Sequence, residues 1–128
     1  MTHGLSSTMP SAPSFVRLLP IFLLALPMAG FGVAKLLGVP ELHRAFQAMA
    51  LPAWFGYFIG AAELAAGIGL LLPRWSALAA TGLIPIMLGA AGFHLAFDVP
   101  SPIPALIFLA LSLYIITLRR KDAIWYPF

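Results

Sequence analysis

Four apolar stretches, separated by short segments containing proline, glycine and charged residues, dominate this sequence. They span residues 15–37, 53–72, 76–97 and 103–118. The hydrocarbon core of a bilayer is about 30 Å thick, and a helix of about 20 apolar residues crosses it. The fourth stretch is the shortest and lies near the lower limit. The pattern predicts four transmembrane helices.

The composition points to the same class of protein. Hydrophobic residues make up 62% of the 128 residues, and charged residues only 9%. A soluble domain of this size has too much surface to hide so many apolar side chains, whereas a lipid bilayer removes the conflict. We therefore expect one all-α domain, a four-transmembrane-helix bundle over residues 14–121. Residues 1–13 are expected to form a disordered tail and residues 122–128 a short C-terminal tail.

The segment between the first two apolar stretches, residues 41–51, follows a different pattern. Its residues Leu42, Phe46 and Met49 share one helical face, and polar residues occupy the other faces. This pattern is typical of a short amphipathic helix that lies on the membrane surface. The fold class is thus a four-helix bundle with one amphipathic helix between its first and second spans.

The basic residues fall unevenly on the two sides of this predicted bundle. Positive residues accumulate on the cytoplasmic side of membrane proteins. The side that carries five of the seven Lys and Arg residues is therefore expected to be cytoplasmic, together with both termini. No basic stripe or motif indicates nucleic acid as a partner, and the absence of cysteine excludes thiol chemistry by this chain. The five are Arg17, Arg74, Arg119, Arg120 and Lys121, and the other two are Lys35 and Arg44.

Three ionisable residues lie inside the apolar stretches: Lys35, Glu63 and His94. A charge in hydrocarbon costs about 2.5 kcal/mol or more on insertion scales, so such residues usually face a protein interior and mark a functional site. Counting along the second span places Glu63 roughly 15 Å deep, near the midplane. Lys35 and His94 lie about one turn from the outer ends of their helices, roughly 10 Å from the depth of Glu63.

Helix direction brings the three side chains toward one layer. Helical side chains lean toward the N-terminus of their own helix. Because the first and third spans run outward and the second runs inward, Lys35, Glu63 and His94 all lean into the outer half of the bundle. Whether Lys35 contacts Glu63 directly, or through a water or ligand, stays open. No metal is expected, because one His and one Glu on separate helices provide too few ligands.

Two interpretations of this polar site compete. The three residues could form a structural clamp that fixes helix register, or a pocket that holds a carbonyl or quinone headgroup and relays protons. Taken singly, Lys35 could extend its ammonium to the membrane surface, and His94 could be a hydrogen-bonded interfacial residue. His43 is expected on the solvated surface, with a place at the rim of the site as the alternative.

Glycines mark the packed face of the second span. Gly56, Gly60 and Gly67 share a helical face with Glu63. Small residues allow helices to approach closely, so this face is expected to pack inside the bundle. Gly56 and Gly60 form a GxxxG motif, which we assign to packing within the chain, with a homo-oligomer interface as the alternative.

The order of these motifs resembles the DoxX-like family of small membrane proteins. The resemblance extends from about Arg17 to Arg119, and the segments that carry it are 32–36 (GVAKL), 51–54 (LPAW), 59–63 (IGAAE), 69–73 (GLLLP) and 87–94 (MLGAAGFH). It implies a four-helix protein of the bacterial inner membrane. Relatives include a subunit of a thiosulfate:quinone oxidoreductase and a membrane component associated with oxidative-stress and thiol-redox systems. The resemblance assigns no catalytic role to Lys35, Glu63 or His94.

These observations lead to one expected function and two alternatives. The expectation is a redox accessory subunit that binds a quinone or similar lipid-soluble molecule. It would have no intrinsic cofactor and would receive electrons from a redox protein partner. The first alternative is a non-catalytic scaffold, or a protein that binds or transports a small apolar solute. The second is an isomerase-like enzyme in which Glu63 and His94 move a proton on a lipid substrate.

Overall fold

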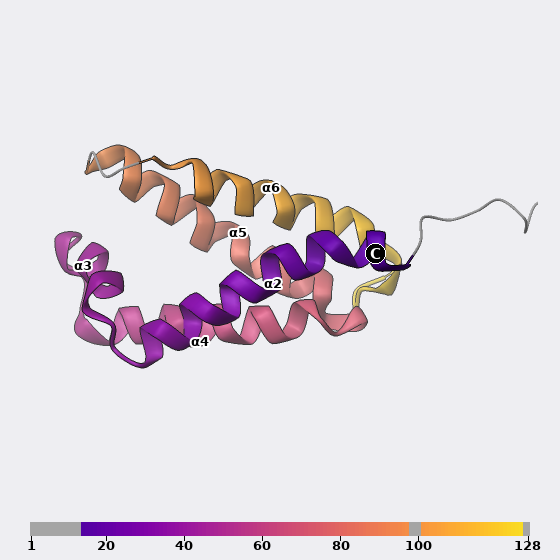
Figure 1. The fold of residues 1–128 in the computed structure, drawn as a ribbon, viewed down its shortest axis with the longest axis horizontal. Helices are drawn as coiled ribbons and strands as arrows, with labels where there is room; N and C mark the ends of the chain where they lie inside the picture. The colour runs from indigo at the N-terminus through magenta and orange to yellow at the C-terminus, as the bar shows by residue number, and fades with distance from the viewer. Residues whose placement is uncertain (1–13, 98–100, 127–128) are drawn as a thin grey trace, which may run out of the picture.

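The protein is all-α over the residues that its computed structural model describes, 14–97 and 101–126 (Figure 1). This confirms the all-α part of the predicted fold class. Within these residues the chain forms five α-helices and one 3₁₀ turn, with no strand. They are α2 (Ser14–Leu36), α3 (Pro40–Ala48), α4 (Ala53–Leu70), α5 (Pro73–Ala96), α6 (Ile103–Leu118) and η1 (Arg120–Asp122).

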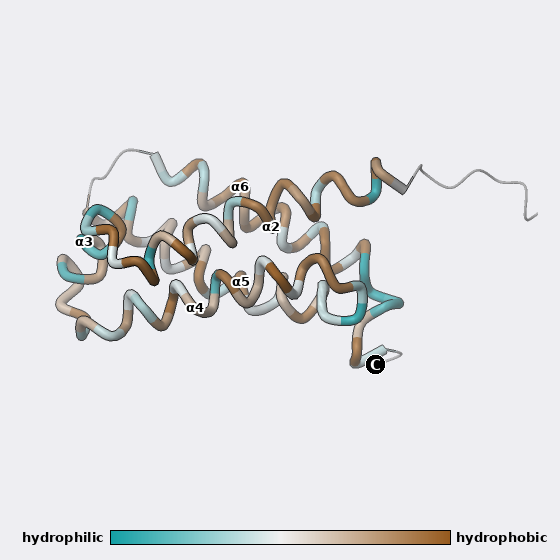
Figure 2. The backbone as a smooth tube through the Cα atoms, turned by 60° about the horizontal axis from the view of Figure 1, so that its bottom comes forward, coloured by the Kyte–Doolittle hydropathy of each residue, from teal (hydrophilic) through white to brown (hydrophobic). Residues whose placement is uncertain are grey.

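Four long helices lie along one axis, and the short helix α3 lies across one end of them (Figure 1). Helix α2 packs mainly against α4, and α5 packs against both α4 and α6. The start of α2, the α4–α5 turn and η1 lie at the opposite end from α3. Polar residues gather at the two ends, and the middle of the bundle is predominantly apolar (Figure 2).

Three of the helices are long and apolar enough to cross a membrane: Phe15–Leu36, Ala53–Leu70 and Pro73–Ala96. Their outer surfaces also suit lipid, since Leu26 and Leu95 are 65% and 72% exposed. Helix α6 is apolar but has only 16 residues, a length of roughly 24 Å against a hydrocarbon thickness of about 30 Å. A fourth membrane span therefore stays a prediction.

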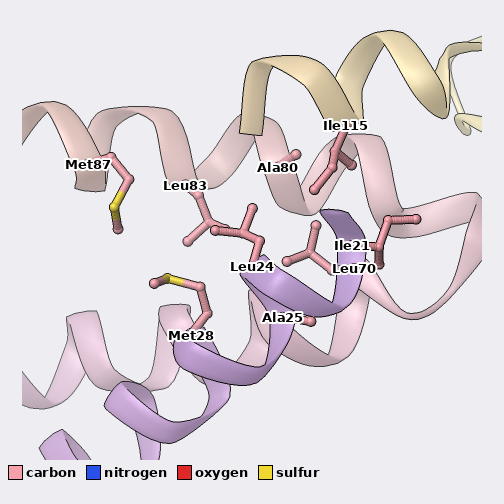
Figure 3. Close-up of a cluster of buried hydrophobic side chains, with 9 residues drawn as sticks. All are labelled: Ile21, Leu24, Ala25, Met28, Leu70, Ala80, Leu83, Met87 and Ile115. Carbon is pink, nitrogen blue, oxygen red and sulfur yellow. The ribbon is translucent and has the colours of Figure 1, made fainter. Parts of the chain in front are cut away.

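The apolar core fills the half of the bundle farthest from α3. Met28 from α2, Leu83 from α5 and Ile115 from α6 are almost completely buried there (Figure 3). The half nearer α3 also contains the buried polar side chains of His43 and Glu63. The full cluster consists of Ile21, Leu24, Ala25, Met28, Leu70, Ala80, Leu83, Met87 and Ile115.

Two helix boundaries differ from the predicted ones by three residues, and the others by no more than two. Helix α5 begins at Pro73 and not at residue 76, because proline is well suited to the first turn of a helix, where its missing N–H has no partner to lose. Helix α3 ends at Ala48, and the chain turns at Ala50, whose φ is 58°. The predicted tail over residues 1–13 and part of the predicted loop after residue 97 lie outside the described residues.

Candidate functional site

Helices α2 and α4 touch backbone to backbone beside the site. A Cβ atom added to Gly32 would lie 2.5 Å from the Leu64 nitrogen and 2.7 Å from the Gly60 oxygen. One added to Gly60 would lie 2.7 Å from the Lys35 Cβ. No side chain fits at either position, so the two glycines set how closely the helices approach.

The other two predicted glycines are also buried on α4. A Cβ on Gly67 would lie 3.0 Å from the backbone oxygen of Ala25 on α2. The space beside Gly56 is occupied by the ring of His43 from α3. The three glycines predicted to mark the packed face of α4 therefore pack within the chain, which leaves the GxxxG pair enclosed by α2 and α3.

Lys35 and Glu63 form an ion pair in this packed region. The Lys35 Nζ lies 2.5 Å from the Glu63 Oε1, and the two side chains are only 12% and 4% exposed. The ammonium also lies 5.6 Å from the centre of the Phe31 ring, a favourable cation–π distance. The lysine therefore points into the bundle and not to the membrane surface.

Lys35 and Glu63 are in direct contact, although their depths counted along the sequence differed by roughly 10 Å. That count assumes that the end of α2 and the start of α4 lie at the same depth in the membrane. Lys35, one residue from the end of α2, instead lies beside Gly60, which is about two turns into α4. Glu63 is thus only one turn farther in, within reach of a lysine side chain that leans inward.

His43 links this ion pair to α3. Its Nε2 lies 2.9 Å from the carbonyl oxygen of Lys35, which also accepts a hydrogen bond from the Gly38 N–H at 3.0 Å. In the tautomer protonated at Nε2, the imidazole N–H is therefore a second donor to a carbonyl in the last turn of α2, where the regular helical donors are missing. The His43 ring also lies 4.6 Å from that of Tyr57.

The expectation that His43 is solvated is wrong, because only 9% of His43 is exposed. The predicted apolar face of Leu42, Phe46 and Met49 did not include His43, which precedes Phe46 by three residues and packs with it against Gly56 of α4. The space that makes this possible comes from Gly56, whose missing side chain leaves room for the ring. A glycine on the neighbouring helix was the available signal, but the sequence does not show which residue faces it.

A cavity of about 370 Å³ opens beside His43, between α3 and the start of α4. His43, Gln47 and Tyr57 contribute polar groups to a wall that is otherwise mostly apolar. The cavity is therefore connected to the buried ion pair through a short path, the His43 ring and the Lys35 carbonyl. The remaining wall residues are Gly38, Pro40, Phe46, Leu51, Pro52 and Ala53.

His94 lies in the last turn of α5 and is half-buried, with its ring 5.8 Å from that of Phe93. The end of α5 lies at the same end of the bundle as α3 (Figure 1), although His94 does not line the cavity beside His43. In the part of the chain that the structure describes, no group of three or more His, Asp or Glu residues is placed to hold a metal ion.

Comparison with known proteins identifies the family. The model of the DoxX-like family matches residues 20–115, about three quarters of the chain. The chain belongs to the DoxX-like family. No curated protein and no solved structure matches it. The matched segment of this DoxX-like protein includes Lys35, His43, Glu63 and His94, and it contains or overlaps all three candidate spans. Family membership and these apolar helices together indicate a membrane protein.

The contacts of His43 lead to a prediction for this DoxX-like protein. His43→Ala removes the hydrogen bond to Lys35 and empties the space over Gly56, so α3 should detach more often. We expect amide exchange in α3 to accelerate by about tenfold, consistent with the loss of one buried hydrogen bond, with little change in α6. Hydrogen exchange read by mass spectrometry in nanodiscs measures this. Arg44→Ala, on the exposed face of α3, is the control, and equal acceleration in both variants would contradict the assignment.

Proposed function

We propose that this DoxX-like protein binds a quinone, or a similar lipid-soluble carbonyl compound, in the cavity beside His43. In this proposal it is a four-span protein of the bacterial inner membrane with cytoplasmic termini, and it serves as an accessory subunit to a redox protein. The observation that carries the proposal is a cavity with three polar side chains at one end of a bundle whose middle is predominantly apolar.

The cavity has the properties that a quinone headgroup requires. Its volume of about 370 Å³ falls in the usual range for small-molecule sites, roughly 300–1,000 Å³. The Gln47 amide and the Tyr57 hydroxyl can donate hydrogen bonds to carbonyl oxygens, and Phe46 offers an aromatic face. Because the cavity lies at one end of the bundle, a headgroup bound there leaves its isoprenoid tail free to enter the hydrocarbon.

The polar residues deeper in the bundle have a role in the same proposal. Reduction of a quinone to a quinol consumes two electrons and two protons. The sequence contains no redox-cofactor motif, so the electrons come from the partner protein. Glu63 and His94 do not line the cavity, so their proposed role is to relay protons toward it and not to contact the headgroup, while Lys35 holds Glu63 in place.

Binding of a short-chain ubiquinone to the protein in nanodiscs tests the proposal. Tyr57→Phe removes one hydroxyl from the cavity wall and should raise the Kd by about fivefold, the effect of one hydrogen bond. Tryptophan fluorescence quenching measures the Kd. Tyr114→Phe is the matched control, because Tyr114 lies on α6, is 55% exposed and is not a wall residue. Absence of saturable binding, or equal Kd values for the two variants, would overturn the proposal.

A non-catalytic scaffold is the second candidate, and the direct contact between Lys35 and Glu63 favours it. The two groups satisfy one another without a ligand and join α2 to α4, as a structural clamp would. A protein that binds no quinone but unfolds readily when either residue is replaced would fit this second function.

A further inference from the structure

A second cavity lies in the other half of the molecule, in a groove between the end of α4 and the start of α5. Its volume is about 530 Å³, and every wall residue is aliphatic, glycine or tryptophan. The half-buried residues Gly69 and Ala79 form its floor, and Ile68 and Leu78, which are 54% and 41% exposed, stand at its sides. The groove shares no wall residue with the cavity beside His43.

The groove faces the hydrocarbon region, because α4 and α5 are both candidate membrane spans. Gly82 leaves part of it unfilled, since a Cβ added there would meet no atom within 4 Å. In a bilayer such space has to be filled by an apolar group, because water in a purely apolar groove would lack hydrogen-bond partners. The available apolar groups are the acyl chains of lipids.

The charge at the mouth of the groove selects among lipids. Arg74 is exposed and lies four residues before the wall residue Leu78, on nearly the same face of α5. Trp75, also a wall residue, is 45% exposed beside it, as expected for a tryptophan at headgroup level. Arg17, Arg120 and Lys121 are exposed at the same end of the bundle.

Few negative charges oppose these cations. At this end of the described chain the acidic side chain is Asp122, which contacts Arg119 at 3.3 Å. Positive residues near a membrane surface attract anionic headgroups. We propose that the α4–α5 groove is a binding site for an anionic phospholipid, with one acyl chain in the groove and the phosphate at Arg74. This proposal does not depend on quinone binding.

The test uses nanodiscs of phosphatidylcholine containing a minor fraction of phosphatidylglycerol, with retained lipid identified by native mass spectrometry. The wild-type protein should retain phosphatidylglycerol above its share of the bilayer. The Cβ of Gly82→Leu has open space around it, and the rest of the side chain should occupy the open part of the groove and reduce retention by about fivefold, an effect of about 1 kcal/mol, comparable to that of burying one methylene group. Gly89→Leu is the matched control, because it lies on the same helix, also has open space around it, and is outside the groove.

The variant Arg74→Gln tests the contribution of the lipid headgroup separately from that of the acyl chain. It should lower the preference for phosphatidylglycerol over phosphatidylcholine by about fivefold while leaving the total number of bound lipids unchanged. Equal retention of the two lipids by the wild-type protein would overturn the proposal, as would equal retention by the Gly82→Leu and Gly89→Leu variants. A wild-type dimer that Gly82→Leu converts to a monomer would also overturn it, since a second copy of the chain would then occupy the groove.

Discussion

Replacing Glu63 alone by leucine should destabilise the protein by about 3–5 kcal/mol, because it leaves the Lys35 ammonium buried without its partner. Replacing Lys35 by methionine and Glu63 by leucine together should cost much less. Two apolar side chains of similar size need no desolvation, and a buried ion pair gains little over them. Reversible unfolding in mixed micelles with increasing sodium dodecyl sulfate measures the free energy of each variant.

The exposed ion pair of η1 provides the control for this cycle. Asp122 contacts Arg119 but its side chain is 46% exposed, so Asp122→Asn should change the free energy of unfolding by less than about 1 kcal/mol. If the effects of the Lys35 and Glu63 replacements simply added in the double variant, the two groups would not be coupled. The ion pair would then not be the element that joins α2 and α4.

The second large effect is expected at Gly32. Gly32→Ala places a Cβ atom against the backbone of α4, 2.5 Å from the Leu64 nitrogen. Backbone atoms cannot rotate away as a side chain can, so α2 and α4 must separate, at a cost of about 1–3 kcal/mol. The same unfolding experiment measures it. The separation should also pull Lys35 away from Glu63 and weaken their contact.

Gly30→Ala is the matched control for this substitution. Gly30 is on the same helix, two residues earlier, and an added Cβ would meet no atom within 4 Å. Alanine is favoured over glycine inside a helix by about 1 kcal/mol, so this variant should be neutral or slightly stabilised. Similar losses in both variants would show that helix approach at Gly32 does not limit stability.

The sequence was sufficient to predict features that depend on periodicity and polarity. Apolar stretches of membrane length predicted the long helices, and the shared face of Gly60, Glu63 and Gly67 indicated a packed side of α4. The inward lean of helical side chains predicted the direction in which Lys35 points. Each of these follows from the geometry of a single helix, which the sequence determines directly.

Features that depend on how two helices are placed against each other could not be predicted. The ion pair forms because Lys35 lies at the same level of the bundle as Gly60. Counting residues along α2 or α4 alone does not show how the two helices are aligned. The burial of His43 depends on how α3 is placed against Gly56 of α4, and the apolar face of Leu42, Phe46 and Met49 alone does not give that placement. The groove at Gly82 could not be predicted for another reason. Small residues are common throughout α4 and α5, so no single glycine indicates where open space is left between the helices.

The position of Lys35 near the end of α2 also has a consequence for biosynthesis. Lys35 is synthesised 28 residues before Glu63, so we expect α2 to enter the bilayer while the ammonium has no partner. Because Lys35 is one residue from the end of its helix, we expect its side chain to reach the headgroups until α4 is inserted and then to turn inward toward the carboxylate of Glu63. A lysine three turns deeper in α2 could not reach the lipid headgroups during insertion.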